Sequence, residues 1–252
     1  MNNIICIANQ KGGVGKTTTA INLASSLAAA EKKTLLIDGD SQGNATSGMG
    51  ITINGNNLYH ALIGQAKLEE VICPTAIPHL DIVASNQDLI GVEVEFIQME
   101  DREKRLRHLL KSLDKQYDFI IIDCPPSLGF MTVNALVAAD FLIVPLQCEY
   151  FAMEGLGYLL NTVRLVKTRL NPELALRGIL LTMFDPRNLL SHRVTEDVKK
   201  HFGEKVFKTI IPRNVRLSES PSHGLPIILY DIKSRGAVAY MELAQEIIEG
   251  GL

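Results

Sequence analysis

The most informative stretch of this chain is Asn9-Gln10-Lys11-Gly12-Gly13-Val14-Gly15-Lys16-Thr17-Thr18-Thr19. An apolar run, residues 4–8, precedes it, and a helical pattern of apolar residues begins at Thr18. A strand, a glycine-rich turn and a helix start, in that order, predict a loop that binds phosphate.

The glycines of this loop leave room for the backbone to curl, so that successive N–H groups point at phosphate oxygens. Lys16 then meets the β- and γ-phosphates, and the hydroxyl of Thr17 becomes a ligand for Mg²⁺. The strand and helix on either side make a chance glycine-rich turn a poor explanation.

The loop departs from the usual G-x-x-x-x-G-K-[ST] pattern, because Gln10 replaces the first glycine and Lys11 adds a second lysine. The pattern K-G-G-x-G-K-T-T resembles the deviant Walker A motif of the ParA/MinD ATPases. In that family the early lysine reaches across a homodimer to the partner's nucleotide. The resemblance implies ATP and Mg²⁺ as ligands, an ATP-dependent homodimer, and ATP contacts from Lys11, Gly12, Gly13, Val14, Gly15, Lys16, Thr17 and Thr18.

Two carboxylates end the next apolar run, at Asp38 and Asp40. Acids at the end of a strand beside a phosphate loop bind Mg²⁺, directly or through water, or orient an attacking water. Residues 38–46 resemble the family motif D-x-D-P-Q-G-N-A-T, which implies that Asp40 serves hydrolysis and that Asp38 supports the metal. Ser41 stands where proline is usual, so we expect a less rigid entry to this loop.

Residues 117–123 form a hydrophobic strand that ends in Asp123, the pattern of a Walker B site. Asp123 is therefore expected to hold the Mg²⁺ shell together with Thr17 and Asp38. The following segment, residues 124–129, resembles the family's D-[CT]-P-P-S-L-G sequence and is expected to sense the γ-phosphate.

Residues 210–224 resemble the P-R-N-V-R-L-x-E-x-P-S-x-G segment of chromosomal ParA/Soj proteins. With this segment the resemblance extends from residue 5 to about residue 235, and the chain is identified as similar to the ParA/Soj partitioning ATPases. Pro212 and Asn214 are the expected adenine contacts. Lys11, Lys16 and Asp40 are the expected catalytic residues of a slow, partner-stimulated Mg²⁺-dependent ATPase.

Continuous apolar runs predict strands covered on both faces by helices. We therefore expect an α/β fold with a doubly wound, mainly parallel sheet flanked by helices, as in P-loop NTPases, over a single domain, residues 1–252. Residues 48–64 are expected to be an irregular surface excursion. The predicted strands are 4–8, 34–37, 80–84, 119–122, 141–146, 179–183, 206–211 and 227–229, and the predicted helices are 18–30, 102–115, 153–170, 191–202 and 237–248.

The composition, 46% hydrophobic and 21% charged residues, is that of a globular protein. No run reaches the ~18 apolar residues that a membrane span needs, and no basic segment leads an apolar stretch at the N-terminus. We expect a cytoplasmic, nucleoid-associated protein with no membrane partner.

Between residues 187 and 235, ten Lys/Arg stand against five Asp/Glu, in a chain whose formal net charge is −3. This local excess predicts either an ordinary solvated surface or a basic face for nucleic acid. The family resemblance favours binding to double-stranded DNA and to a ParB-type centromere-binding partner. Because no helix-turn-helix region precedes the loop, the DNA binding is expected to be nonspecific. The DNA candidates are Arg187, Arg213, Arg216, Lys233 and Arg235.

Two other functions compete with this interpretation. A MinD-like membrane-cycling ATPase needs a basic amphipathic C-terminal helix, whereas residues 241–252 are amphipathic and acidic, which favours a helix docked on the core. A metabolic P-loop ligase needs a second substrate pocket, of which the sequence holds no sign.

Overall fold

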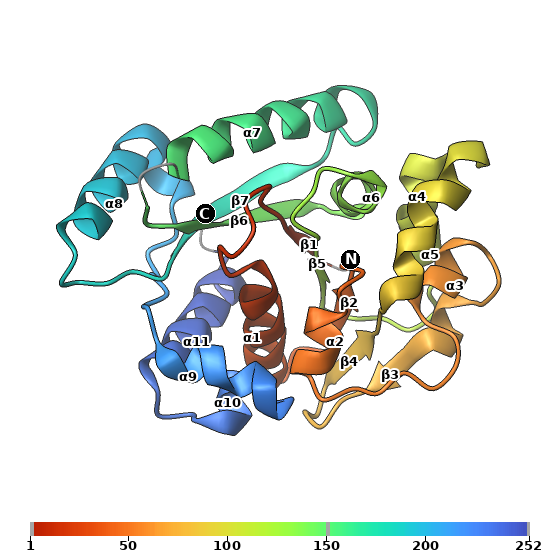
Figure 1. Cartoon of the computed structure of the whole chain (residues 1–252), viewed down its shortest axis with the longest axis horizontal. Helices are drawn as coiled ribbons and strands as arrows, with labels where there is room; N and C mark the ends of the chain where they lie inside the picture. Colours follow the sequence, from red (N-terminus) through yellow and green to blue (C-terminus); the bar gives the residue numbers. More distant parts are fainter. Residues whose placement is uncertain (1–2, 150–151, 251–252) are drawn as a thin grey trace.

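A central sheet organises the chain in the computed structural model, which describes residues 3–149 and 152–250, the side chains of residues 152–154 excepted (Figure 1). Within these residues seven strands pair in the order β3-β4-β2-β5-β1-β6-β7. Every neighbouring pair is parallel except β3 and β4. The strands are β1 (Asn3–Ile7), β2 (Thr34–Asp38), β3 (Ile72–Pro74), β4 (Leu80–Val83), β5 (Phe119–Asp123), β6 (Phe141–Gln147) and β7 (Ala175–Thr182).

Helices cover both faces of this sheet, so β2 and β5 are buried along their whole length. On one face α1 packs with α2, α9, α10 and α11, and on the other lie α3 to α8 (Figure 1). The doubly wound, mainly parallel fold is thus confirmed. The helices are α1 (Lys16–Ala29), α2 (Asn44–Gly48), α3 (Leu58–Leu62), α4 (Val92–Glu95), α5 (Arg105–Lys111), α6 (Phe130–Ala138), α7 (Ala152–Arg169), α8 (Leu189–Phe202), α9 (Val215–Glu219), α10 (Ile227–Tyr230) and α11 (Arg235–Ile248).

The strand predicted over residues 206–211 is wrong. This segment runs beside β7 and meets it at the isolated bridge between Ile179 and Val206. The backbone N–H groups of Lys208 and Thr209 donate instead to the carboxylate of Glu246 on α11, at 2.8 and 3.1 Å. Because α11 takes these donors, no regular ladder forms.

The strand predicted over residues 227–229 is also wrong, because these residues lie in α10. The helical turn follows Pro226, and the N–H of Ile227 donates to Oδ1 of Asn22 at 2.7 Å. A run of three apolar residues does not distinguish a strand from a helical turn.

Residues 48–64 are less irregular than predicted. The capping residue Asn57 accepts a hydrogen bond from Tyr59 N at 2.9 Å and begins α3. Leu58 and Leu62 of this helix are completely buried in the core. The edge strand β3, which the sequence analysis did not predict, pairs antiparallel with β4 nearby.

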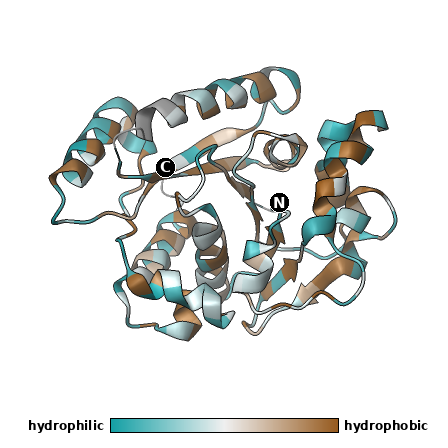
Figure 2. Cartoon of the chain, viewed as in Figure 1, coloured by the Kyte–Doolittle hydropathy of each residue, from teal (hydrophilic) through white to brown (hydrophobic). Residues whose placement is uncertain are grey.

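The C-terminal helix α11 docks on α1, as predicted for an acidic amphipathic helix. Tyr240 and Leu243 of this helix are buried, and the hydroxyl groups of Tyr240 and Thr19 lie 3.2 Å apart. The strands appear as mostly hydrophobic ribbon between the two layers (Figure 2). Across the described residues, no helix has the length and apolarity to cross a bilayer.

Candidate nucleotide site

The phosphate loop connects β1 to α1 and is shaped by two glycines with left-handed backbone, Gly13 (φ 73°) and Gly15 (φ 86°). Such angles strain any residue with a Cβ atom. No side chain caps α1, and its first turn holds no acidic residue. The first N–H groups of α1, and the positive end of its dipole, are therefore available to an anion.

Lys16 is almost completely enclosed beneath this loop, with 6% of its surface exposed. Its Nζ donates to the carbonyl oxygen of Lys11 at 3.0 Å. Burial lowers the pKa of Lys16 from its ordinary value, while the Asp123 carboxylate acts in the opposite direction. Phosphate oxygens bound here would favour the charged ammonium group further.

Asp38 and Asp123 end the adjacent strands β2 and β5 and are paired in register. Both carboxylate oxygens of Asp123 are buried, and neither has a hydrogen-bond partner among the described residues. Burial raises the pKa of Asp123 well above its ordinary value, the Asp38 carboxylate raises it further, and the Thr17 hydroxyl opposes the rise. A buried carboxylate without a donor is the environment that a hard cation satisfies.

The neighbouring Asp38 is satisfied by the protein itself. Its carboxylate accepts hydrogen bonds from the N–H and the hydroxyl of Thr46, both at 2.7 Å, and from the N–H of Asp40 at 3.2 Å. Burial raises its pKa to about 6 in spite of these bonds. Asp38 therefore shapes the loop that carries Asp40, whereas Asp123 is the better placed metal ligand.

Hydrogen bonds hold the loop after β2, in which Ser41 replaces the proline that the motif usually has. The Asp40 carboxylate accepts from Gln42 N at 3.0 Å, and the Asp40 carbonyl accepts from the hydroxyl of Ser85 at 2.7 Å. A Cβ atom at Gly39 would lie 2.6 Å from the carbonyl oxygen of Asp123. Glycine thus permits the close approach of the two strand ends.

The side chain of Lys11 contacts the segment that follows β6. Its Nζ lies 3.0 Å from Oε2 of Glu149, and about half of each side chain is exposed. Glu149 was not among the predicted site residues, because no local sequence pattern connects it with the loop.

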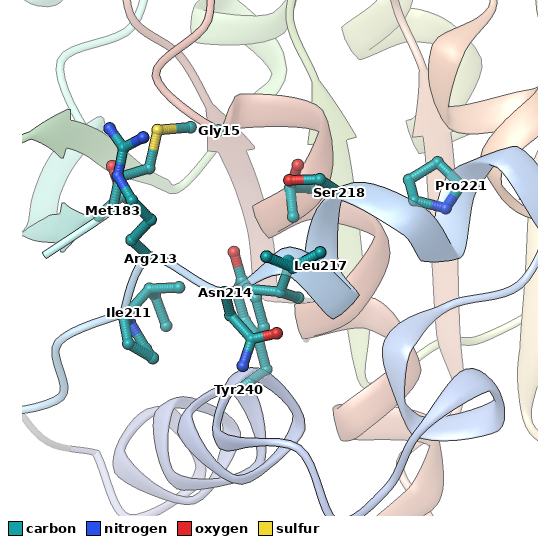
Figure 3. Close-up of a pocket in the computed structure, with 13 residues that line it drawn as sticks. Gly15, Met183, Ile211, Arg213, Asn214, Leu217, Ser218, Pro221 and Tyr240 are labelled. Atoms are coloured by element: carbon teal, nitrogen blue, oxygen red, sulfur yellow. The ribbon is translucent and has the colours of Figure 1, made fainter. Parts of the chain in front are cut away.

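A cavity of about 410 Å³ opens beside the loop, and Pro212 and Asn214 both line it. Its other walls include Gly15 from the loop, Leu217 from α9 and Tyr240 from α11 (Figure 3). The size and the mixed apolar and amide lining suit a nucleotide base. Oδ1 of Asn214 already accepts from Arg216 N at 2.8 Å, so its NH₂ group is the free polar end.

Met183 also lines this cavity and has left-handed backbone (φ 52°), which is uncommon for a residue with a side chain. It follows Thr182, whose hydroxyl donates to the carbonyl of Val14 at 2.9 Å. The end of β7 is thereby joined to the phosphate loop. The order of residues along the chain gave no signal for this contact.

The five predicted DNA-binding cations are exposed and lie on neighbouring segments. Arg187 forms a two-pronged pair with Asp185, at 3.0 and 2.8 Å, and the bridge between Phe184 and Pro212 places Arg213 beside that loop. Arg216 lies 2.9 Å from Glu219 and 3.5 Å from Asp231. Acidic partners thus balance part of the positive charge. Lys233 lies between α10 and α11, and Arg235 is the first residue of α11.

Comparison with known proteins agrees with this geometry. A family model described as an AAA domain matches residues 2–176. The chain is 56% identical to the chromosome partitioning protein ParA of Myxococcus xanthus, over 98% of this chain and 88% of that protein. It is 53% identical to the sporulation initiation inhibitor protein Soj of Bacillus subtilis, over the full length of both. The chain belongs to the ParA/Soj family of chromosome-partitioning ATPases.

Solved structures similar to this ParA/Soj chain have nucleotides in place. Cobyrinic acid a,c-diamide synthase from Mycobacterium smegmatis, with bound ADP and magnesium, has a TM-score of 0.87 at 35% identity, over 99% of this chain and 95% of that one. A putative plasmid partition protein from Borrelia burgdorferi bound to AMPPNP has a TM-score of 0.85 at 28% identity, over the full length of both. Relatives that share the fold of this chain therefore bind adenine nucleotides.

Proposed function

We propose that this chain is an ATP-dependent dimerising switch that binds nonspecific DNA and hydrolyses ATP to drive the partitioning of a chromosome or plasmid. The observation that carries the proposal is the buried, unpartnered carboxylate of Asp123, which lies in the Coulombic field of Lys16 and beside the Thr17 hydroxyl. Together with the uncapped start of α1, these groups form a site for a metal–triphosphate complex.

In this proposal the loop N–H groups and Lys16 hold the phosphates, and Thr17 and Asp123 hold Mg²⁺, with Asp38 in support. Mg²⁺ would neutralise charge that develops on the phosphate oxygens. Among the described residues no three His, Cys, Asp or Glu side chains are grouped as a metal cage. This fits Mg²⁺, which takes most of its ligands from phosphate and water.

Asp40 would orient the attacking water. Its backbone is hydrogen-bonded to Asp38 and Ser85, and its carboxylate accepts a hydrogen bond from Gln42 N. A positioned group of this kind saves the cost of ordering the water during the reaction.

Lys11 would act across a homodimer, where it neutralises the partner subunit's phosphates. Two joined subunits also pair their basic residues, Arg187, Arg213, Arg216, Lys233 and Arg235. Doubling the phosphate contacts steepens both DNA affinity and its dependence on salt. Hydrolysis would then release the dimer and the DNA, at a slow rate that a ParB-type partner accelerates, which implies association with the nucleoid.

The two competing functions receive less support. The C-terminal helix of a membrane-cycling protein would need a free apolar face, whereas Tyr240 and Leu243 of α11 are buried against the core. A small-molecule ligase is represented among the structural relatives at 35% identity, but identity to the ParA of Myxococcus xanthus is 56%.

The test is binding of the chain to random-sequence duplex DNA with ATP, with ADP and without nucleotide, over a series of salt concentrations. We expect binding that is selective for ATP and falls with salt. The control is Lys16→Ala, which should bind neither nucleotide nor DNA. ATP-dependent dimers that ignore DNA at low salt would remove the DNA part of the proposal, and retained ATP affinity in Lys16→Ala would remove the assigned phosphate site.

A further inference from the structure

An apolar stripe faces solvent on the segment that follows β4. The segment comprises a 3₁₀ turn (Gln87–Gly91), α4 and a second 3₁₀ turn (Phe96–Gln98). Ile90, Val94 and Ile97 are 56%, 69% and 62% exposed. Their spacing of four and three residues places them on one side of a helical segment.

The opposite side of the same segment packs in the core, where Leu89, Val92 and Phe96 are buried. The exposed stripe is therefore a second apolar face that the fold itself does not need. Single exposed apolar residues are ordinary, but three in helical register form a surface that another helix or peptide can cover.

The charged side chains that this segment itself carries have one sign, although Arg102 Nη1, from the turn that follows, donates to the carbonyl oxygen of Ile97 at 3.2 Å. Residues 87–98 contain Asp88, Glu93 and Glu95 and no Lys or Arg, and all three acids are exposed. A second group of exposed apolar residues, which includes Val215 and Ile232, lies instead among the arginines and lysines of the predicted DNA face. Of the two, the stripe on α4 is the one that complements a positively charged segment.

The stripe is connected to the nucleotide site through Glu93. Oε1 of Glu93 accepts a hydrogen bond from Phe130 N, the first residue of α6, at 3.1 Å. A Cβ atom at Gly129 would lie 2.6 Å from the same oxygen, so a larger residue there would displace the Glu93 carboxylate from this position. Gly129 ends the segment that begins after Asp123 and is predicted to sense the γ-phosphate.

We propose that Ile90, Val94 and Ile97, with the surrounding carboxylates, are the docking surface for a positively charged amphipathic segment of the partner protein, and that Glu93 transmits docking to the segment after Asp123. A Lys or Arg of the bound segment pairs with the exposed Glu93 carboxylate and draws it from Phe130 N. The start of α6 and residues 124–129 are then free to shift. Glu93 is a positioning residue, not a catalytic one.

This inference rests on the proposed function, in which a ParB-type partner accelerates hydrolysis. The test uses the full chain, DNA, ATP and the purified ParB-type protein of the same organism, and measures ATPase rate against partner concentration. Val94→Asp and Ile90→Asp alter the stripe. Leu165→Asp is the matched control, because Leu165 is 58% exposed on α7, away from the stripe.

For Val94→Asp we expect unchanged ATPase activity without partner and at least a tenfold increase in the partner concentration that gives half the stimulation. Ile90→Asp should behave alike, and it provides a second variant if either one unfolds. Glu93→Gln keeps an acceptor for Phe130 N but cannot form the ion pair. Glu93→Gln should lower the maximal ATPase rate with partner by a larger factor than it raises the partner concentration that gives half the stimulation. Loss of folding would not separate these two effects.

Wild-type behaviour in both Asp variants would overturn the docking surface. Loss of ATP-dependent dimerisation in Val94→Asp would overturn it too, because the stripe would then join two copies of this chain. If the partner neither binds nor stimulates the wild-type chain, the partner in the proposed function is wrong and the inference falls with it. ATP-dependent DNA binding, measured without partner, would be unaffected by that result. It therefore distinguishes failure of the docking surface from failure of the proposed DNA-binding function.

Discussion

Lys11 and Glu149 form an ion pair, with 3.0 Å between Nζ and Oε2. Glu149, two residues after the end of β6, also accepts a hydrogen bond from the side chain of Gln147 through its other oxygen. A lysine held in this way has to leave Glu149 before it reaches a partner subunit. In the proposed dimer, the pair would therefore oppose the reach of Lys11 to the partner subunit.

Glu149→Gln should lower the ATP concentration at which dimers form. A half-exposed ion pair is worth about 0.2–1 kcal/mol, so the change should be about 1.4-fold to 5-fold. Light scattering after size-exclusion chromatography, over an ATP titration, measures it. Glu103→Gln, which breaks the comparably exposed pair with Arg102, is the control. A requirement for more ATP in Glu149→Gln would show that Glu149 supports the dimer instead.

Asp40→Ala should bind ATP and form dimers but hydrolyse ATP at least about 100-fold more slowly, because the water loses the group that orients it. The variant should also remain on DNA with ATP for longer than the wild type. Phosphate release and DNA dissociation measure the two effects, and Asp114→Ala, at an exposed acid, is the control. An unchanged hydrolysis rate would exclude Asp40 from the mechanism.

Arg216→Glu should weaken DNA binding and leave ATP-dependent dimerisation intact. Because Glu219 and Asp231 surround Arg216, this change gathers three carboxylates, so Arg213→Gln is a useful second variant. The slope of log affinity against log salt should fall by about 1 for each DNA phosphate that the variant no longer neutralises. Arg164→Glu, at an exposed position on α7, carries the same charge change. Equal DNA affinities in the wild type and the three variants would show that neither Arg213 nor Arg216 takes part in DNA binding.

Asp38→Asn should change how stability depends on pH. Burial raises the pKa of Asp38 from 3.8 to about 6 in the folded chain, so the folded state binds the proton more tightly than the unfolded state. The resulting stabilisation is present below pH ~4 and is lost as the pH rises to ~6. Asparagine does not ionise and avoids this loss.

The advantage of Asp38→Asn over the wild type should therefore grow between pH ~4 and ~6 and stay constant above. A shift of this size corresponds to about 3 kcal/mol, less about 1–3 kcal/mol because the asparagine NH₂ group cannot accept the hydrogen bond that Asp38 accepts from Asp40 N. Thermal unfolding of both proteins at pH 4.5 and 7.5 measures the difference. A difference independent of pH would show that Asp38 does not titrate in this range.

The meeting of the predicted site residues at one edge of the sheet was predictable from sequence because it depends on local order. Residues 9–19 specify a strand, a turn and a helix start within a few positions, and Asp38 and Asp123 each end an apolar run. Parallel strands bring their carboxyl ends to one edge of the sheet, so these groups had to meet. The mainly parallel sheet was also predictable, because the continuous apolar runs that indicate it are local features of the sequence.

Contacts between distant segments were decided by the tertiary structure alone. Glu149 stands 138 positions after Lys11, and nothing near either residue indicates their pairing. Glu246 on α11 takes the donors of residues 208 and 209 and so prevents the predicted strand. The packing of the layers likewise decides which arginines are already paired. It also brings Glu93 to α6. Local sequence determines which chemical groups lie at the edge of the sheet, and packing between distant segments determines which of them are free to act.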